Sequence, residues 1–172
     1  MRRLTTVAVA SVMALSAATP ASAAEPSAAQ GAWRPAPQAS YDLPAGARCD
    51  FAVHTQPVVD EVRKLVLDTY PDGRPKRELY AGDLILEITN TQTGASTRAD
   101  AGGTTMIDYH ADGSMTWYAV GPVMAGFRAG GGTLPRGLYI LDGVYTLDIA
   151  ADGYKTVDMI QGSTRDLCAD VA

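Results

Sequence analysis

The sequence predicts an all-β protein built as an antiparallel up-and-down β-barrel, with a β-sandwich as the alternative. Apolar and polar residues alternate with period two through most of residues 47–172. Four Asp-Gly dipeptides, which are typical of hairpin turns, separate the alternating stretches. Many short strands in a body of this size should close or split into two sheets, because either arrangement limits exposed edges. With 172 residues, 47% apolar and 19% charged, the composition is that of one globular domain.

The N-terminus has the three parts of a secretory signal peptide. Arg2 and Arg3 are followed by an apolar run over 7–18 and by the small-x-small site Ala21-Ser22-Ala23. The run is too short to span a bilayer as an anchor. We therefore expect residues 1–23 to be removed after Ala23, which leaves a secreted, extracellular protein with no transmembrane segment.

The mature chain is acidic. Removal of 1–23 lowers the count of basic residues from 14 to 12 against 19 acidic residues, a net charge of −7. Nucleic-acid binding requires clustered Lys and Arg, and anionic lipid surfaces attract basic segments. We expect neither partner.

Residues 24–46 form an Ala/Pro-rich arm without helical or strand periodicity. We expect this arm to be extended and disordered. Its two aromatic residues, Trp33 and Tyr41, either dock on the body or stay solvated, and we expect a solvated tail.

The body, residues 47–172, is predicted as one β-barrel domain. We expect type I′ turns at the four Asp-Gly dipeptides, 72–73, 112–113, 142–143 and 152–153. Residues 59–70 fit a helix as well as a strand, and the strand is favoured because the stretch runs into a turn. Residues 166–171 are compatible with a short final helix. The predicted strands cover 49–59, 62–70, 77–90, 96–101, 104–110, 114–120, 123–128, 138–141, 144–149 and 154–161.

Cys49 and Cys168 lie at the two ends of the body. In an exported chain an even pair of cysteines indicates a disulfide. No C-x-x-C motif is present, so a redox-active pair is the less favoured alternative. We expect one disulfide that joins the N-terminal and C-terminal segments.

No catalytic motif stands out in the sequence. His54 and His110 are the only imidazoles, and they do not show a metal-ligand spacing with the carboxylates. Glu87, Asp108 and Asp148 alternate with apolar residues and are predicted on the solvated face. We therefore predict no catalytic residue, no metal and no cofactor. An enzyme using Glu87, Asp108 or His110 would need one of them buried beside a cavity.

The segment 117–127 (WYAVGPVMAGF) is apolar on both faces except for the Tyr118 hydroxyl. It is either covered on both sides or exposes a patch for an interface or a ligand. Two functions follow for a monomeric, non-catalytic protein. It binds a small apolar or amphipathic ligand, or it is a cell-envelope or protein-interaction accessory module that uses an exposed face of 117–127. The candidate ligand-lining residues are Tyr109, Met115, Trp117, Tyr118, Tyr139 and Tyr145.

Several pieces of the body resemble a family of uncharacterised secreted proteins of actinobacteria. They are Cys49-Asp50-Phe51, ITNTQTGAS at 88–96, ADGSMTWYAVGP at 111–122, GLYILDGVYTLDI at 137–149 and Asp166-Leu167-Cys168. The resemblance implies a single exported β-domain, similar to lipocalin-type calycin barrels. It carries no catalytic residues.

Overall fold

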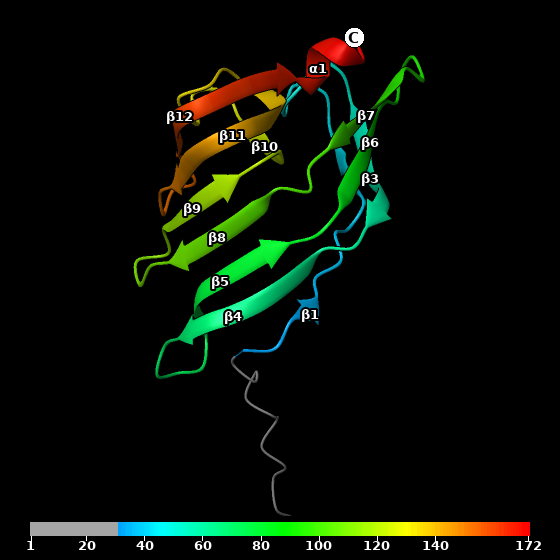
Figure 1. Ribbon diagram of the computed structural model, residues 1–172. Helices are drawn as coiled ribbons and strands as arrows, with labels where there is room; N and C mark the ends of the chain where they lie inside the picture. Colours follow the sequence, from blue (N-terminus) through cyan, green and yellow to red (C-terminus); the bar gives the residue numbers. More distant parts are fainter. Residues whose placement is uncertain (1–30) are drawn as a thin grey trace, which may run out of the picture.

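A computed structural model describes residues 31–172, and the signal-peptide prediction lies outside them. The chain forms two antiparallel sheets and one short helix (Figure 1). The larger sheet has the order β1-β4-β5-β8-β9-β11-β10, with β12 also paired to β11, and the smaller one is β2-β3-β6-β7. The elements are β1 (Arg34–Pro35), β2 (Tyr41–Leu43), β3 (Val53–Asp60), β4 (Arg63–Thr69), β5 (Pro75–Ala81), β6 (Leu84–Asn90), β7 (Ser96–Asp100), β8 (Thr104–Tyr109), β9 (Met115–Val120), β10 (Val123–Phe127), β11 (Gly137–Ile149), β12 (Lys155–Asp166) and α1 (Leu167–Asp170).

Three pairs of consecutive strands pass from one sheet to the other. β3 leads into β4, β5 into β6 and β7 into β8, each through a break of two or three residues (Figure 1). The break between β5 and β6 lies at Gly82, whose φ is +136°. A Cβ atom there would overlap the backbone carbonyl of Glu61, which lies in the break between β3 and β4. Glycine therefore permits the close approach at which the chain leaves one sheet for the other.

The expected closed barrel is wrong for the described residues, and the two sheets fit the sandwich alternative. The edge strand β7 pairs with β6 alone. Between β12 and β7 a side-chain hydrogen bond from Arg165 Nη2 to Thr97 Oγ1 (3.1 Å) takes the place of a backbone ladder. Because the strands turn at the breaks and split into two sheets, one part of the core lies between the sheets.

The prediction of a hairpin turn at Asp142-Gly143 is also wrong. β11 runs without interruption through both residues, and Gly143 pairs with Gly162 of β12. The other three dipeptides do form turns, but none is type I′. No described residue other than glycine has a positive φ, so the aspartates stay in ordinary conformations.

These three turns share one hydrogen-bond pattern. At Asp112-Gly113, Gly113 N–H donates to the carbonyl of His110, and Ser114 N–H donates to Asp112 Oδ1 (3.0 Å). Glycine supplies the left-handed residue that ends the turn, and the aspartate side chain closes it.

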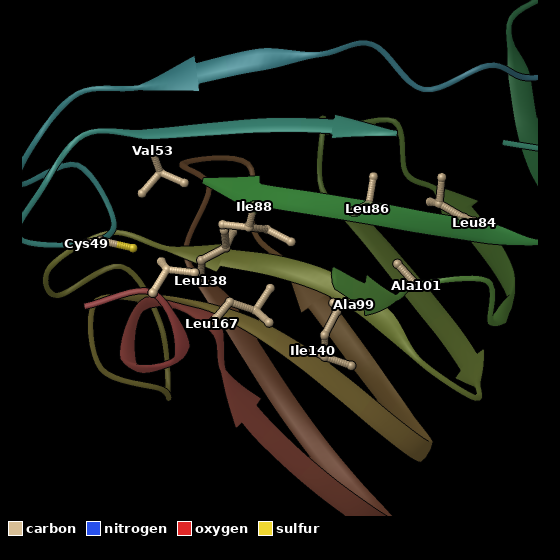
Figure 2. Packing of buried hydrophobic residues seen from close by; sticks show 11 residues of the cluster. Cys49, Val53, Leu84, Leu86, Ile88, Ala99, Ala101, Leu138, Ile140 and Leu167 are labelled. Carbon is tan, nitrogen blue, oxygen red and sulfur yellow. The ribbon is translucent and has the colours of Figure 1, made fainter. Parts of the chain in front are cut away.

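The core has two parts. The first lies between the small sheet and the β10–β11 end of the large one, as Figure 2 shows for Ile88, Leu138 and Ile140. The second, centred on Phe127 and Tyr145, lies on the other face of β10 and β11 and extends to β9 and β12. Phe127 and Tyr139 pack edge to face, with ring centroids 5.8 Å apart.

The predicted disulfide is confirmed. Cys49 and Cys168 are bonded across 119 positions of sequence, with Cα atoms 5.4 Å apart. The short helix is confirmed as α1, with Asp166 as N-cap accepting from the Cys168 backbone N–H (2.9 Å). Buried Leu167 and Val171 flank the disulfide and hold the C-terminus against the first core cluster.

The described part of the arm, 31–46, is docked. β1 pairs with β4, and β2 pairs with β3 through Tyr41 and Thr55. The arm is extended, but the expected solvated tail does not hold for these residues. The arm passes over the break between the two sheets, where the candidate site lies.

Candidate functional site

A pocket of about 390 Å³ lies between the two core clusters. It shares Leu86 and Met124 with the first cluster and Trp117 and Val123 with the second. Strands β5, β6, β8, β9 and β10 and the docked arm supply its walls. The lining residues are Gln38, Ala39, Tyr41, Val62, Tyr80, Gly82, Leu84, Leu86, Ala101, Gly103, Thr105, Ile107, Tyr109, Trp117, Val123 and Met124.

Small residues keep this space open. Ala101 and Gly103 occupy the break between β7 and β8, and Ala39 belongs to the arm above it. The strands part at this break, and Ala39 and Ala101 have little side chain with which to fill the gap, whereas Gly103 permits close approach to the backbone of Gly121 and Pro122. Apolar packing on both sides fixes the walls, so the pocket is part of the folded structure.

Trp117, one of the residues that line the pocket, carries an unsatisfied hydrogen-bond donor. Its indole Nε1 is buried and makes no hydrogen bond within the described residues. Trp117 lies opposite Ile107 of β8 and Leu147 of β11. A buried donor without a partner is costly and uncommon.

A buried carboxylate lies beside the pocket. Glu78 of β5 is 2% exposed. Its Oε1 accepts from Lys64 Nζ (3.0 Å), and its Oε2 accepts from the hydroxyls of Tyr80 (2.8 Å) and Tyr109 (2.9 Å). Tyr80 and Tyr109 line the pocket, and Glu78 lies behind them.

The charges in this cluster favour ionised Glu78. Burial raises the pKa of the carboxyl, but hydrogen bonds from Tyr80, Lys64 and Tyr109 outweigh it, so the pKa is lowered. The hydrogen bond to Glu78 raises the pKa of Lys64. Burial, followed by hydrogen bonding to Tyr80 and Glu78, raises the pKa of Tyr109. The two phenols thus keep their protons and donate them to Glu78.

The structure brings two of the six predicted lining residues, Tyr109 and Trp117, into the pocket. Met115 lies on the same face of β9 as Trp117, near the strand end and outside the lining. Tyr118 points to the opposite face and is 43% exposed. Tyr139 and Tyr145 are buried in the second core cluster.

Glu78 and Tyr80 were missed from the sequence, although a signal was present. The alternation that places Leu84 and Leu86 on the apolar face also places Glu78 and Tyr80 there when it is continued towards the N-terminus. A carboxylate in phase with an apolar face is a candidate for burial with partners.

The other titratable candidates bond to neighbours on the solvated face. Asp108 is ion-paired with Arg77, and Asp148 accepts from Thr116 Oγ1 (2.7 Å). Glu87 contacts Arg98 at 3.4 Å. His110 Nε2 is 3.3 Å from Thr116 Oγ1, and His54 contacts Asp42 at 2.8 Å. None of these residues lines the pocket.

The segment 117–127 is divided between the two faces of its strands. Phe127 is fully buried and Val123 lines the pocket, whereas Tyr118 and Val120 are 43% and 59% exposed. Val120 lies opposite Val144 of β11, which is 42% exposed. On its other side, Val144 lies opposite Gln161 of β12, and the preceding residue, Ile160, is also exposed. We call Tyr118, Val120, Val144 and Ile160 the outer patch.

Residues 31–172 contain no group of three His, Cys, Asp or Glu side chains placed to hold a metal ion. In the same part of the chain, no helix is long and apolar enough to cross a membrane. No protein-family model, curated protein or solved structure matches the chain.

Proposed function

We propose that this chain is an exported, non-catalytic protein that binds a small apolar or amphipathic ligand in the pocket between its two core clusters. The observation that carries the proposal is a pocket whose wall is mostly apolar and includes Tyr80 and Tyr109, whose hydroxyls are oriented by Glu78. Pockets of roughly 300–1,000 Å³ with apolar walls and a few placed polar groups are typical of small-molecule sites.

The polar groups of the pocket favour binding over catalysis. Glu78 is behind the wall, and its two oxygens already accept three hydrogen bonds. Its lowered pKa makes it a poor proton acceptor. The hydroxyls of Tyr80 and Tyr109 are oriented by this carboxylate, so they can position a ligand without taking part in proton transfer.

The test is binding of N-phenyl-1-naphthylamine, a neutral amphipathic dye whose emission rises in apolar surroundings. We expect saturable binding with one site per chain. Ala101→Leu places a larger side chain in the pocket and should weaken binding at least tenfold. Ala150→Leu, the same change at an exposed turn residue outside the pocket, should leave it unchanged.

Ala39→Leu in the arm fills the same space without altering the core, and it covers the case in which Ala101→Leu fails to fold. Near-ultraviolet circular dichroism establishes that each variant is folded. If folded Ala101→Leu and Ala39→Leu bind the dye as the unaltered protein does, the pocket is not the binding site and the proposal is overturned.

The outer patch favours a second function, that of a module bound to a cell-envelope protein. Exposed Val120 and Val144 lie opposite each other by strand register, and exposed Ile160 of β12 precedes Gln161, the partner of Val144. On this alternative, the protein sediments with isolated cell envelopes, and the double variant V120D/I160D does not. The control is Thr164→Asp, an exposed change on β12 away from the patch. Equal sedimentation of V120D/I160D and the unaltered protein would contradict this alternative.

A further inference from the structure

We infer that Arg48, Arg128 and Lys155 form a second binding site, which takes a phosphate monoester group. None of the three residues lines the pocket between the core clusters, so this site is separate from the one proposed above. The inference depends on three features: cations without carboxylate partners, their meeting at the end of β10, and glycines that make room for them.

The three cations lack ion pairs in an acidic protein. Of the twelve lysine and arginine side chains in residues 31–172, seven are ion-paired with a carboxylate, and these three are not. Each instead donates to a backbone carbonyl, at 2.7 or 2.8 Å. Two aspartates lie close to them in sequence, but Asp50 is ion-paired with another arginine, and the carboxylate of Asp152 accepts from a backbone N–H. The positive charge of the cluster is therefore left without an opposite charge.

The cations come from three separate segments and meet at the end of β10. Lys155 Nζ donates to the carbonyl of Gly126 (2.7 Å), and a Cβ atom on the same glycine would stand 2.8 Å from Arg48 Nε. Arg128 follows β10 directly, and its guanidinium donates to the carbonyl of Asp152 (2.8 Å). The loop after Arg128 also makes two backbone hydrogen bonds with Lys155. One short stretch of chain thus gathers all three charges.

Two glycines make room for the guanidinium groups. A Cβ atom on Gly131 would overlap the Arg128 side chain, which lies across this glycine. A Cβ atom on Gly126 would meet Arg48 in the same way. Neither glycine has a positive φ, so the backbone conformation does not require glycine at either position. What the two glycines provide is space for the arginines.

The charges also act on one another. Lys155 is partly buried, and its burial, followed by the charges of Arg48 and Arg128, lowers its pKa. Like charges that lie close together without a counter-ion repel each other. A bound anion would remove this repulsion and restore what the cations lose by desolvation.

The chemistry of the three side chains favours a phosphate monoester over a carboxylate. A phosphate monoester carries a charge of about −1.5 to −2 at pH 7 and has three strong acceptor oxygens. The planar guanidinium groups of Arg48 and Arg128 can each donate two hydrogen bonds to such a group, and the ammonium of Lys155 adds a compact charge. A carboxylate has one charge and two oxygens, which would leave part of the cluster uncompensated.

The experiment is calorimetric titration with phenyl phosphate at neutral pH and constant ionic strength. We expect one molecule to bind per chain. Benzenesulfonate has a similar shape but a single negative charge, and it should bind about tenfold more weakly. Equal affinity for both probes would overturn the phosphate assignment, since the site would then select charge sign alone.

Arg128→Gln and Lys155→Met should each weaken the binding of phenyl phosphate about tenfold, because each removes a charge-assisted hydrogen bond. Arg63→Gln is the matched control: Arg63 is an arginine of β4, near the opposite edge of the large sheet, and its loss should leave the affinity unchanged. Arg128 is exposed, so Arg128→Gln tests the site even if Lys155→Met does not fold. Folded Arg128→Gln that binds phenyl phosphate as the unaltered protein does would overturn the inference.

The same group occurs on soluble esters and on lipids, and a second measurement separates these sources. Vesicles of phosphatidylcholine that contain phosphatidic acid present a phosphate monoester on a surface. Binding of phenyl phosphate without sedimentation on these vesicles assigns the site to a soluble ester, and sedimentation that Arg128→Gln abolishes assigns it to a lipid headgroup. If the unaltered protein binds neither, the inference is overturned. Dye binding in the pocket should be the same for Arg128→Gln and the unaltered protein, so the two proposals succeed or fail separately.

Discussion

Gly143 of β11 lies directly opposite Gly162 of β12, and a Cβ atom on Gly143 would stand 2.6 Å from the Cα atom of Gly162. Both residues have positive φ, +142° and +147°. The pair lets two long strands approach closely at the point where β11 passes from pairing with β10 to pairing with β9. This glycine pair lies where the sequence, through Asp142-Gly143, predicts a turn.

Gly143→Ala should therefore lower the free energy of unfolding by about 3 kcal/mol or more, because its Cβ meets backbone atoms that cannot move aside. Urea unfolding measures this change. Gly113→Ala is the control, since Gly113 also has a positive φ (+88°) but no atom within 4 Å of the added Cβ. It should cost about 1–2 kcal/mol. Equal losses at both positions would show that close approach is unimportant at Gly143.

The disulfide joins the start of the body to α1. Replacing Cys49 and Cys168 by serine should cost about 2–5 kcal/mol of stability. Thermal unfolding with and without a reductant tests this expectation. The reductant should lower the midpoint of the unaltered protein to that of the double variant and should not affect the variant. A midpoint insensitive to reductant in both proteins would contradict the stabilising role.

Glu78→Gln should destabilise the protein by about 1–3 kcal/mol, because Lys64 loses its partner and the tyrosine hydroxyls lose a charged acceptor. Lys64 is partly exposed, so water reduces the penalty. Chemical unfolding at neutral pH measures the loss. The double variant K64M/E78Q is the matched control and should recover part of it, since no unpaired charge remains.

Glu78 also makes the stability of the folded protein depend on pH. The folded pKa of Glu78 is below its unfolded value of 4.5, so its contribution to stability is present above about pH 4.5. The contribution is lost as the pH falls through the folded pKa. Subtracting the stability of Glu78→Gln from that of the unaltered protein between pH 7 and pH 3 should give a difference that shrinks on acidification. A difference that grows on acidification would show that the folded pKa is raised.

Tyr109→Phe should cost about 1 kcal/mol of stability and leave the pocket shape unchanged, because it removes one hydrogen bond to Glu78. The readout that separates a binding role from a structural one is the affinity for 2-naphthol against 2-methylnaphthalene. We expect the preference for the hydroxylated probe to fall. An unchanged preference would show that the Tyr109 oxygen does not face the ligand.

The sequence predicts most strands because one face of each is apolar. In β8, Ile107 and Tyr109 face inward and Asp108 faces Arg77, as the alternation requires. It does not predict the break at Gly82, because the alternation from Tyr80 to Leu84 continues through the glycine. The two strands thus look like one. The break depends on a close approach to Glu61, which is visible only in the folded chain.

The candidate site, like the fold, can be predicted from the sequence only in part. Trp117 and Tyr109 belong to apolar faces, and their sequence neighbours identify them. Tyr139 and Tyr145 have the same pattern but are covered by the second core cluster. Local sequence does not distinguish a core face from a pocket wall, because the difference depends on residues of other elements, such as the small residues Ala39 and Ala101.

Native mass spectrometry of the unreduced full chain, recovered from the medium of cells that export it, shows whether the pocket holds a ligand. We expect a retained adduct of a few hundred daltons on the unaltered protein and on Ala150→Leu, and its loss from folded Ala101→Leu. A bare mass for all three proteins, or an adduct that Ala101→Leu keeps, would contradict the claim that the pocket between the two core clusters binds a ligand.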